Sequence, residues 1–190
     1  MTPLAIRIPD GQRWLRVAAR GWGDPLDTVF SEPRGGRWNP PGSFPVLYLN
    51  ADLYTARAQI LALLEGQPVR PEELEDDAYV LVAATLPGRQ SVADAISARG
   101  LAALGLPKSY PRDEHGRRIA RTACQPVGAA VHASGLRGVS CRSAATSDGT
   151  GRELAWFPAR RSSRAKQVGR PVAFGVWWYA PDADQIFEES

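Results

Sequence analysis

The sequence has few of the residues from which metal sites and disulfides are built. Its 190 residues include only two cysteines, Cys124 and Cys141, and two histidines, His115 and His132. Their spacing matches no zinc motif, so we expect no metal site and interpret both cysteines as buried thiols. Histidines in such isolated positions are more often surface or helix residues than catalytic groups, and we assign them no role.

Long apolar runs are also absent. No stretch approaches the roughly 18 apolar residues that a membrane-spanning helix requires. The first residues, "MTPLAIRIPDGQRW", lack the basic, apolar and small-residue order of a signal peptide. We therefore expect a cytoplasmic protein that has no membrane partner.

Lysine is scarce, because only Lys108 and Lys166 are lysines among the 23 basic residues. This bias fits a GC-rich genome as well as a preference for guanidinium chemistry. Residues 1–95 carry 9 basic and 12 acidic side chains, a net charge of −3, whereas residues 96–190 carry 14 and 8, a net charge of +6. The basic half is suited to an anionic ligand or an acidic partner, although charge asymmetry discriminates poorly between these classes.

The length suits one well-cored domain, so we predict a single domain over residues 1–190. Apolar residues at three- and four-residue spacing predict a helix that starts at Asp52 and is ended by Gly66. Two further helices are expected, at 91–100 and from Pro126, in its first turn, to Gly135. Alternating or short apolar runs predict strands at 13–18, 44–50, 78–86, 138–143, 152–158 and 171–180. Because strands and helices mix without regular βαβ alternation, we predict an α+β fold with a mixed sheet and flanking helices.

The stretch "RGGRWNPPG", residues 34–42, has the most unusual composition in the chain. It lacks the Lys-Ser/Thr ending of a P-loop and the spacing of a dinucleotide-binding glycine motif. Its glycines permit positive φ and its prolines stiffen the chain, so it is suited to present Arg37, Trp38 and Asn39 from a rigid turn. Spacing alone favours the alternative, a structural turn in which Trp38 packs.

These motifs together resemble the RES-domain family. An Arg in an early strand ("WLRVA"), then "GGRWNPPG", then a strand ending in Tyr ("VLYL") and a helix are similar to the start of that family. "ACQPVGAAVHASGLRGVSCRSAA", residues 123–145, is similar to its later helix and to the strand that bears a Ser. The resemblance covers most of the chain, and "GGRWNPPG" is its specific part. The family is named for a characteristic Arg, Glu and Ser, and its members are bacterial toxins of toxin–antitoxin pairs.

The resemblance implies a fold related to ADP-ribosyltransferases, with NAD⁺ bound in a cleft. It implies cleavage of the nicotinamide–ribose bond and transfer of ADP-ribose to water, phosphate or a protein. It also implies an antitoxin of the Xre type whose helix-turn-helix domain binds DNA, so that this chain meets DNA only through its partner. A homodimer is the default expectation for a soluble chain.

Residue by residue, Arg16 matches the early Arg, Arg37 the Arg of the glycine-rich motif, Tyr48 the strand-end Tyr and Ser143 the Ser. Guanidiniums hold a diphosphate by bidentate, charge-assisted hydrogen bonds, which suits Arg16 and Arg37. Tyr48 would supply a wall for the cationic nicotinamide. Trp38 and Asn39 join the predicted NAD⁺-binding set through the turn. Ser143 has no His nearby in sequence to activate it, so we predict that it orients the sugar.

The sequence departs from the family at Gln59, where the helical Glu is expected. An amide can bond a ribose hydroxyl but cannot offset the positive charge that develops on the ribose. Glu65 would point away from that helix face. For Glu153 we favour a solvent-facing strand carboxylate over one that lines the cleft. Three explanations stay open: a weakened or altered enzyme, a binding-only relative, or an introduced substitution.

Three functional hypotheses follow. The first is an NAD⁺-cleaving RES toxin with catalytic residues Arg16, Tyr48, Gln59 and Ser143, in which Gln59→Glu raises the rate. The second is a non-catalytic interaction protein that keeps the fold and binds an antitoxin. The third is a nucleic-acid-binding module based on "ARRSSRAK", residues 159–166, for which a solvated loop or a contact with an acidic antitoxin segment is the simpler interpretation.

Overall fold

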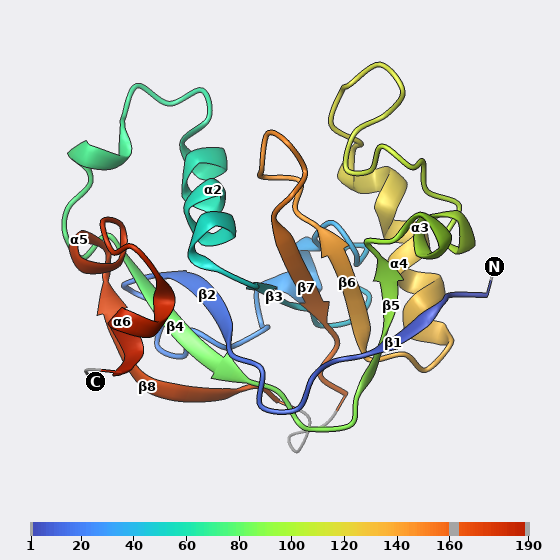
Figure 1. The fold of residues 1–190 in the computed structure, drawn as a ribbon, viewed down its shortest axis with the longest axis horizontal. Helices are drawn as coiled ribbons and strands as arrows, with labels where there is room; N and C mark the ends of the chain where they lie inside the picture. The colour runs from blue at the N-terminus through green and yellow to red at the C-terminus, as the bar shows by residue number, and fades with distance from the viewer. Residues whose placement is uncertain (1, 160–163, 189–190) are drawn as a thin grey trace.

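A computed structural model describes residues 2–159 and 164–188, and its centre is one mixed eight-stranded sheet (Figure 1). The order across the sheet is β1-β5-β6-β7-β3-β2-β4-β8. Every neighbouring pair is antiparallel except β5 and β6, which are parallel. The strands are β1 Ala5–Arg7, β2 Trp14–Ala19, β3 Leu47–Asn50, β4 Tyr79–Thr85, β5 Ser91–Ala95, β6 Gly138–Arg142, β7 Arg152–Trp156 and β8 Lys166–Ala173.

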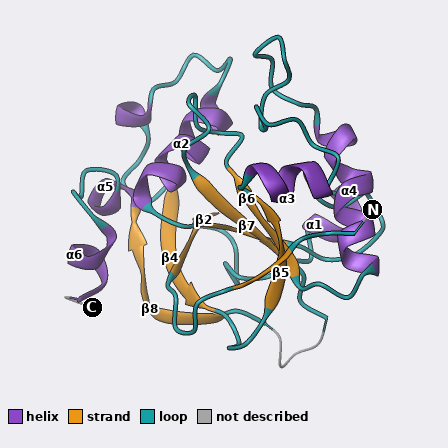
Figure 2. Ribbon diagram, turned by 45° about the vertical axis from the view of Figure 1, so that its right-hand side comes forward, coloured by secondary structure: helices purple, strands orange, loops and turns teal. Residues whose placement is uncertain are grey.

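Helices flank the sheet on both of its halves. Helices α2, α5 and α6 lie by the half formed by β2, β4 and β8, and α3 and α4 lie by the half formed by β5 and β6 (Figure 1). The strands curve strongly between the two halves (Figure 2). This arrangement confirms the predicted α+β class with a mixed sheet. The helices are α1 Ser31–Arg34, α2 Leu53–Leu64, α3 Ala98–Ala103, α4 Arg121–Ala133, α5 Phe174–Trp177 and α6 Ala183–Glu188, with a 3₁₀ turn at Pro71–Glu73.

Helix α2 forms where the apolar spacing predicts it. The Asp52 side chain caps the helix by accepting a hydrogen bond of 2.7 Å from the Thr55 backbone N–H. Leu53, Ala56 and Ile60 are buried in a cluster with apolar residues of β2 and β4. Because this face is held against the sheet, the neighbouring face of α2 points toward β3 and β7.

Helix α4 packs unusually close to the "RGGRWNPPG" turn. A Cβ at Gly128 would lie 1.8 Å from the carbonyl oxygen of Trp38, so only glycine allows this approach. The prediction that Pro126 lies in the first turn is wrong, since α4 begins five residues earlier at Arg121. Pro126 has no N–H to donate to the Thr122 carbonyl four residues earlier. Thr122 lies in the exposed first turn of α4, where water can donate to that carbonyl instead.

Two predicted elements are wrong because tertiary pairing overrides local preference. The predicted helix at 91–100 is strand β5 followed by α3, since β5 pairs with both β1 and β6. The predicted strand at 171–180 ends at Ala173, and α5 follows. Phe174 and Trp177 are three residues apart on one helical face, and both are buried.

Smaller differences concern two other segments. The strand predicted at 44–50 is shorter, with β3 starting at Leu47. Of the predicted basic loop at 159–166, residues 160–163 lie outside the described residues and Lys166 already belongs to β8. No helix in the described part of the chain is long and apolar enough to cross a membrane.

Candidate functional site

A pocket of about 300 Å³ lies where α2, the ends of β3 and β7, and the "RGGRWNPPG" turn meet. It brings together three of the predicted site residues from three separate segments: Arg37, Tyr48 and Gln59. Its complete lining is Gly36, Arg37, Tyr48, Leu49, Asn50, Gln59, Arg121 and Glu153.

The Tyr48 ring is fixed as one wall of this pocket. Its hydroxyl donates to Oδ1 of Asn39 at 3.0 Å and accepts from the backbone N–H of Trp38 at 2.9 Å. A Cβ on Gly36 would lie 2.3 Å from that hydroxyl, so the glycine lets the turn close over the ring. Burial raises the pKa of Tyr48, which keeps the hydroxyl protonated as a donor.

Trp38 and Asn39 lie behind this wall and not in the pocket. Both are fully buried. The Asn39 amide donates to the carbonyls of Ser31 at 2.7 Å and of Phe44 at 3.0 Å, and the Trp38 ring packs 5.9 Å from that of Tyr110. The structure therefore gives both residues the task of holding the turn and Tyr48, and it does not bring them to the pocket surface.

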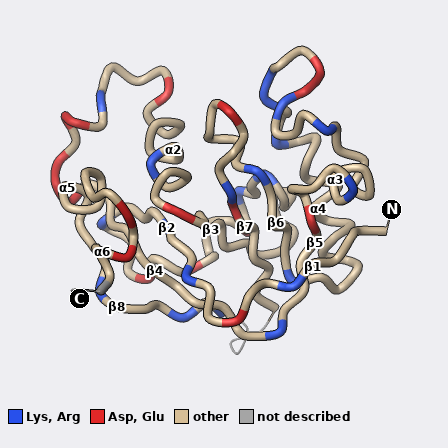
Figure 3. Tube along the Cα trace, in the orientation of Figure 1, with Lys and Arg blue, Asp and Glu red and all other residues tan. Residues whose placement is uncertain are grey.

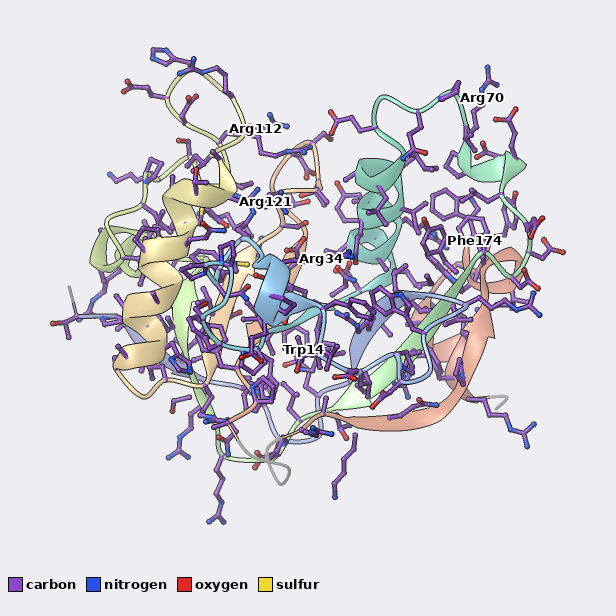
Figure 4. All side chains as sticks on the ribbon, turned by 180° about the vertical axis from the view of Figure 1, so that it is seen from behind. Trp14, Arg34, Arg70, Arg112, Arg121 and Phe174 are labelled. Carbon is purple, nitrogen blue, oxygen red and sulfur yellow. The ribbon has the colours of Figure 1, made fainter. Side chains whose placement is uncertain are left out.

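Two guanidiniums lie at the pocket. Arg37 is anchored by Nη1, which donates to the Ile119 carbonyl at 2.9 Å and contacts the Cys124 sulfur at 3.6 Å. Arg121, in the first turn of α4, is exposed and makes no ion pair within residues 2–159 and 164–188 (Figure 4). Two cations at one pocket suit an anionic group. Arg121 was not among the predicted site residues, and the only signal for it was its place just before the later family-like segment, residues 123–145.

Arg16 points to the other face of the sheet. Leu15 is paired with Asn50, so Arg16, one residue on, faces away from the side on which Asn50 lines the pocket. Its Nε donates to the Pro25 carbonyl at 2.7 Å and its Nη1 to the Tyr48 carbonyl at 2.8 Å. Burial lowers the pKa of Arg16 to about 10, although nearby Asp24 acts in the opposite direction. Arg16 thus supports the backbone of β3, and its contact with NAD⁺ stays a prediction.

Gln59 reaches the pocket from α2 and is held there by Asn50. The Asn50 amide donates to Oε1 of Gln59 at 2.8 Å. Asn50 is the last residue of β3 and is almost fully buried. Asn50 was not among the predicted site residues, because nothing in its spacing shows that it contacts the helix that follows.

The solvent-facing assignment of Glu153 is wrong. Glu153 lines the pocket and stands directly opposite Asn50 in the pairing of β3 with β7. The Ser143 hydroxyl donates a hydrogen bond to Oε1 of Glu153 and accepts one from the Ala145 N–H at 3.1 Å. Ser143 itself is fully buried and is not part of the lining, so it reaches the pocket only through Glu153. Desolvation raises the pKa of Glu153, opposed by the Ser143 hydrogen bond and the charge of Arg37.

Charged residues also gather outside the pocket. In the long connection between α3 and α4, basic and acidic positions are mixed (Figure 3). Among the described residues, no group of three or more His, Cys, Asp or Glu side chains is placed to hold a metal ion. The pocket combines cations, a fixed aromatic wall and one carboxylate, which suits a ligand with an anionic part and a part that becomes positive during reaction.

Comparisons with known proteins agree with this geometry. A family model described as "RES domain" matches residues 7–180. A solved structure, the crystal structure of the M. tuberculosis MbcT-MbcA toxin–antitoxin complex, is similar with a TM-score of 0.68 and 20% identity, over 98% of this chain and 92% of that one. This similarity confirms the predicted fold. None of the curated proteins compared with the sequence matches it.

Proposed function

Since the chain belongs to the RES domain family, we propose that it is the toxin of a bacterial toxin–antitoxin pair, which binds NAD⁺ and cleaves its nicotinamide–ribose bond. One observation carries the proposal. The family motif, β3 and α2 converge on a single pocket that holds Arg37, Tyr48 and Gln59 together with a carboxylate. Four further pockets on the described part of the chain are lined by none of these three residues.

The chemistry of the lining fits NAD⁺. Arg37 and Arg121 offer guanidinium donors for the diphosphate, and the anchored Nη1 of Arg37 fixes the direction of the rest of its group. The Tyr48 ring is a flat surface for the cationic nicotinamide. The pocket volume is at the lower end of the usual range of about 300–1,000 Å³, so it suits the nicotinamide riboside end, with the diphosphate near exposed Arg121.

The reaction needs little covalent chemistry from the protein. The bond between the nicotinamide nitrogen and ribose C1′ breaks, its electron pair leaves with neutral nicotinamide, and positive charge develops on the ribose. Gln59 offers a hydrogen bond to a ribose hydroxyl but no negative charge. Loss of a preorganised electrostatic group costs about 10²–10³ in rate, so a pocket that relied on position 59 alone would be a weakened enzyme.

The partner belongs to the same proposal. The similar solved structure is a toxin bound to its antitoxin, and we propose an antitoxin of the helix-turn-helix type for this chain. DNA would be contacted through that partner. A homodimer and the cytoplasmic location stay predictions.

The proposal is tested by incubating the purified chain with NAD⁺ and measuring nicotinamide release, with and without added phosphate. Calorimetry measures NAD⁺ binding in parallel. Replacing Arg37 by Ala removes charge-assisted hydrogen bonds worth about 1.5–3 kcal/mol, so NAD⁺ should bind roughly 10- to 150-fold more weakly. Arg99→Ala, which changes an exposed arginine away from the pocket, is the matched control. Absence of both binding and turnover, for the parent and for Gln59→Glu, would reject the proposal.

Gln59 favours one alternative, a non-catalytic relative that keeps the fold and binds an antitoxin. This protein would bind a helix-turn-helix protein encoded by the adjacent gene without consuming NAD⁺. Co-purification of the two chains, combined with no nicotinamide release over long incubation, would support this alternative over the enzyme.

A further inference from the structure

We propose that Glu153 on β7 supplies the carboxylate that α2 lacks at position 59, so that the negative charge facing the nicotinamide ribose comes from the opposite wall of the pocket. This inference rests on the proposed NAD⁺-cleaving function and assigns the electrostatic role within it. Among the described residues, Glu153 is the one carboxylate in the lining.

The two positions are neighbours through Asn50. Glu153 and Asn50 are directly paired in β7 and β3, which places their Cβ atoms about 4.5–5.5 Å apart on the same face of the sheet. The Asn50 amide in turn donates to the Gln59 side chain at 2.8 Å. Gln59, Asn50 and Glu153 thus form a continuous polar row across the pocket, and a charge at either end acts on the same small volume.

The Glu153 carboxylate is held in place. Its Oε1 accepts from the buried Ser143 hydroxyl, whose own oxygen accepts from the Ala145 N–H. The Ser143 backbone N–H donates to the Gly151 carbonyl at 2.8 Å, which ties the ends of the β6–β7 connection together. Oε2 of Glu153 has no hydrogen-bond partner in residues 2–159 and 164–188 and is therefore available to a ligand. Ser143 is a positioning residue in this assignment.

The role is electrostatic, and the chemical step balances without further components. NAD⁺ and water give ADP-ribose, nicotinamide and one proton. The C1′–nitrogen bond breaks, its electron pair goes to nicotinamide, and water adds to C1′ and releases the proton to solvent. Glu153 forms no covalent bond. Its negative charge stabilises the positive ribose in the transition state, where a buried carboxylate acts more strongly than in water.

The assignment changes the expectation for Gln59→Glu. A second carboxylate beside Glu153 would share its pocket, and two close carboxylates do not both ionise readily. The single variant Gln59→Glu therefore gains no rate. By contrast, the exchange variant Gln59→Glu/Glu153→Gln keeps one carboxylate in the pocket and recovers part of what Glu153→Gln loses.

The activity test compares these chains by nicotinamide release. We expect Glu153→Gln to lower kcat about 10²- to 10³-fold. NAD⁺ affinity by calorimetry should change little, because the carboxylate acts mainly in the transition state. Glu72→Gln, which neutralises an exposed glutamate of the 3₁₀ turn, is the matched control and keeps the parental rate. If Glu153→Gln does not fold, Glu153→Ala replaces it, and added formate should restore rate in that cavity.

A binding test needs no turnover. A ribose analogue whose ring oxygen is replaced by a protonated nitrogen mimics the charge of the transition state, and its neutral tetrahydrofuran counterpart does not. The parent should bind the cationic analogue about tenfold or more tightly than the neutral one. Glu153→Gln should lose this preference and keep its affinity for the neutral analogue.

The outcomes separate the two proposals. A parent chain that neither binds nor cleaves NAD⁺ overturns the proposed function and this assignment with it. A parent chain that cleaves NAD⁺, with Glu153→Gln within about threefold of its rate and the same preference for the cationic analogue, overturns only the assignment to Glu153. Formate without effect on a folded, inactive Glu153→Ala chain also counts against it.

Discussion

Replacing Asn39 by Ala should destabilise the protein more than any other single amide truncation in the pocket region. The Asn39 side chain is fully buried and makes three hydrogen bonds: its amide donates to the Ser31 and Phe44 carbonyls, and its Oδ1 accepts from the Tyr48 hydroxyl. Alanine removes all three bonds without adding a partner. The turn that carries Arg37 and the ring of Tyr48 would lose a common anchor.

The magnitude follows from what happens to each partner. The bond to the Phe44 carbonyl is buried, so its loss leaves an unsatisfied acceptor at a cost of about 1–3 kcal/mol. The bonds to Ser31 and Tyr48 are partly buried, and water can replace part of each, for a cost of about 0.5–1.5 kcal/mol apiece. The sum is about 2–6 kcal/mol, a large share of the roughly 5–15 kcal/mol that stabilises a typical domain.

Thermal and urea unfolding measure the effect. For a chain of this size, about 1 kcal/mol shifts Tm by roughly 2–4 °C, so Asn39→Ala should lower Tm by roughly 4–24 °C. The control is Asn50→Ala, at a nearly fully buried asparagine whose side chain makes one hydrogen bond within the described part of the chain, to Gln59. It should cost only about 0.5–1.5 kcal/mol. Equal losses for the two variants, or an unchanged Tm for Asn39→Ala, would refute the reasoning.

Three further predictions concern packing, pH and thiol chemistry. Gly128→Ala should lower the free energy of unfolding, measured by urea titration, by about 1–3 kcal/mol or more, because the new Cβ would overlap the backbone of the turn. The control Gly21→Ala, where nothing lies within 4 Å of the new Cβ, should change this free energy little. Folding raises the pKa of the Glu153 carboxyl. The parent therefore loses stability as pH rises from the pKa of this carboxyl in the unfolded chain, about 4.3, through its higher pKa in the folded chain. The Tm of Glu153→Gln minus that of the parent should therefore grow from about pH 4 to about pH 8, and a constant difference would contradict the burial of this carboxylate. Cys124 and Cys141 are buried with raised pKa values, so a thiol reagent should label neither in the folded protein and both after denaturation; rapid labelling of the native chain would contradict this.

Much of the fold was predictable from local patterns. Helix α2 and strands β2, β4, β6 and β7 lie where apolar spacing or short apolar runs predicted them, since the apolar residues of these segments are largely buried. The segments at 91–100 and 171–180 were predicted wrongly, because their Ala-rich and aromatic-rich sequences are compatible with both states. Pairing of β5 with two neighbours and packing of Phe174 and Trp177 against α2 decided them.

By itself, the sequence determined which residues belong to the family motif, that Arg37, Tyr48 and Gln59 follow one another in a turn, a strand and a helix, and that position 59 carries no charge. Only the tertiary structure decided that Glu153 faces the pocket. Alternation along a strand shows which residues share a face, but strand register across the sheet determines which face meets the site. The same register pairs Asn50 of β3 with Glu153 of β7. The one carboxylate of the described lining therefore lies on β7, across the pocket from α2, the helix on which the family resemblance implies a Glu.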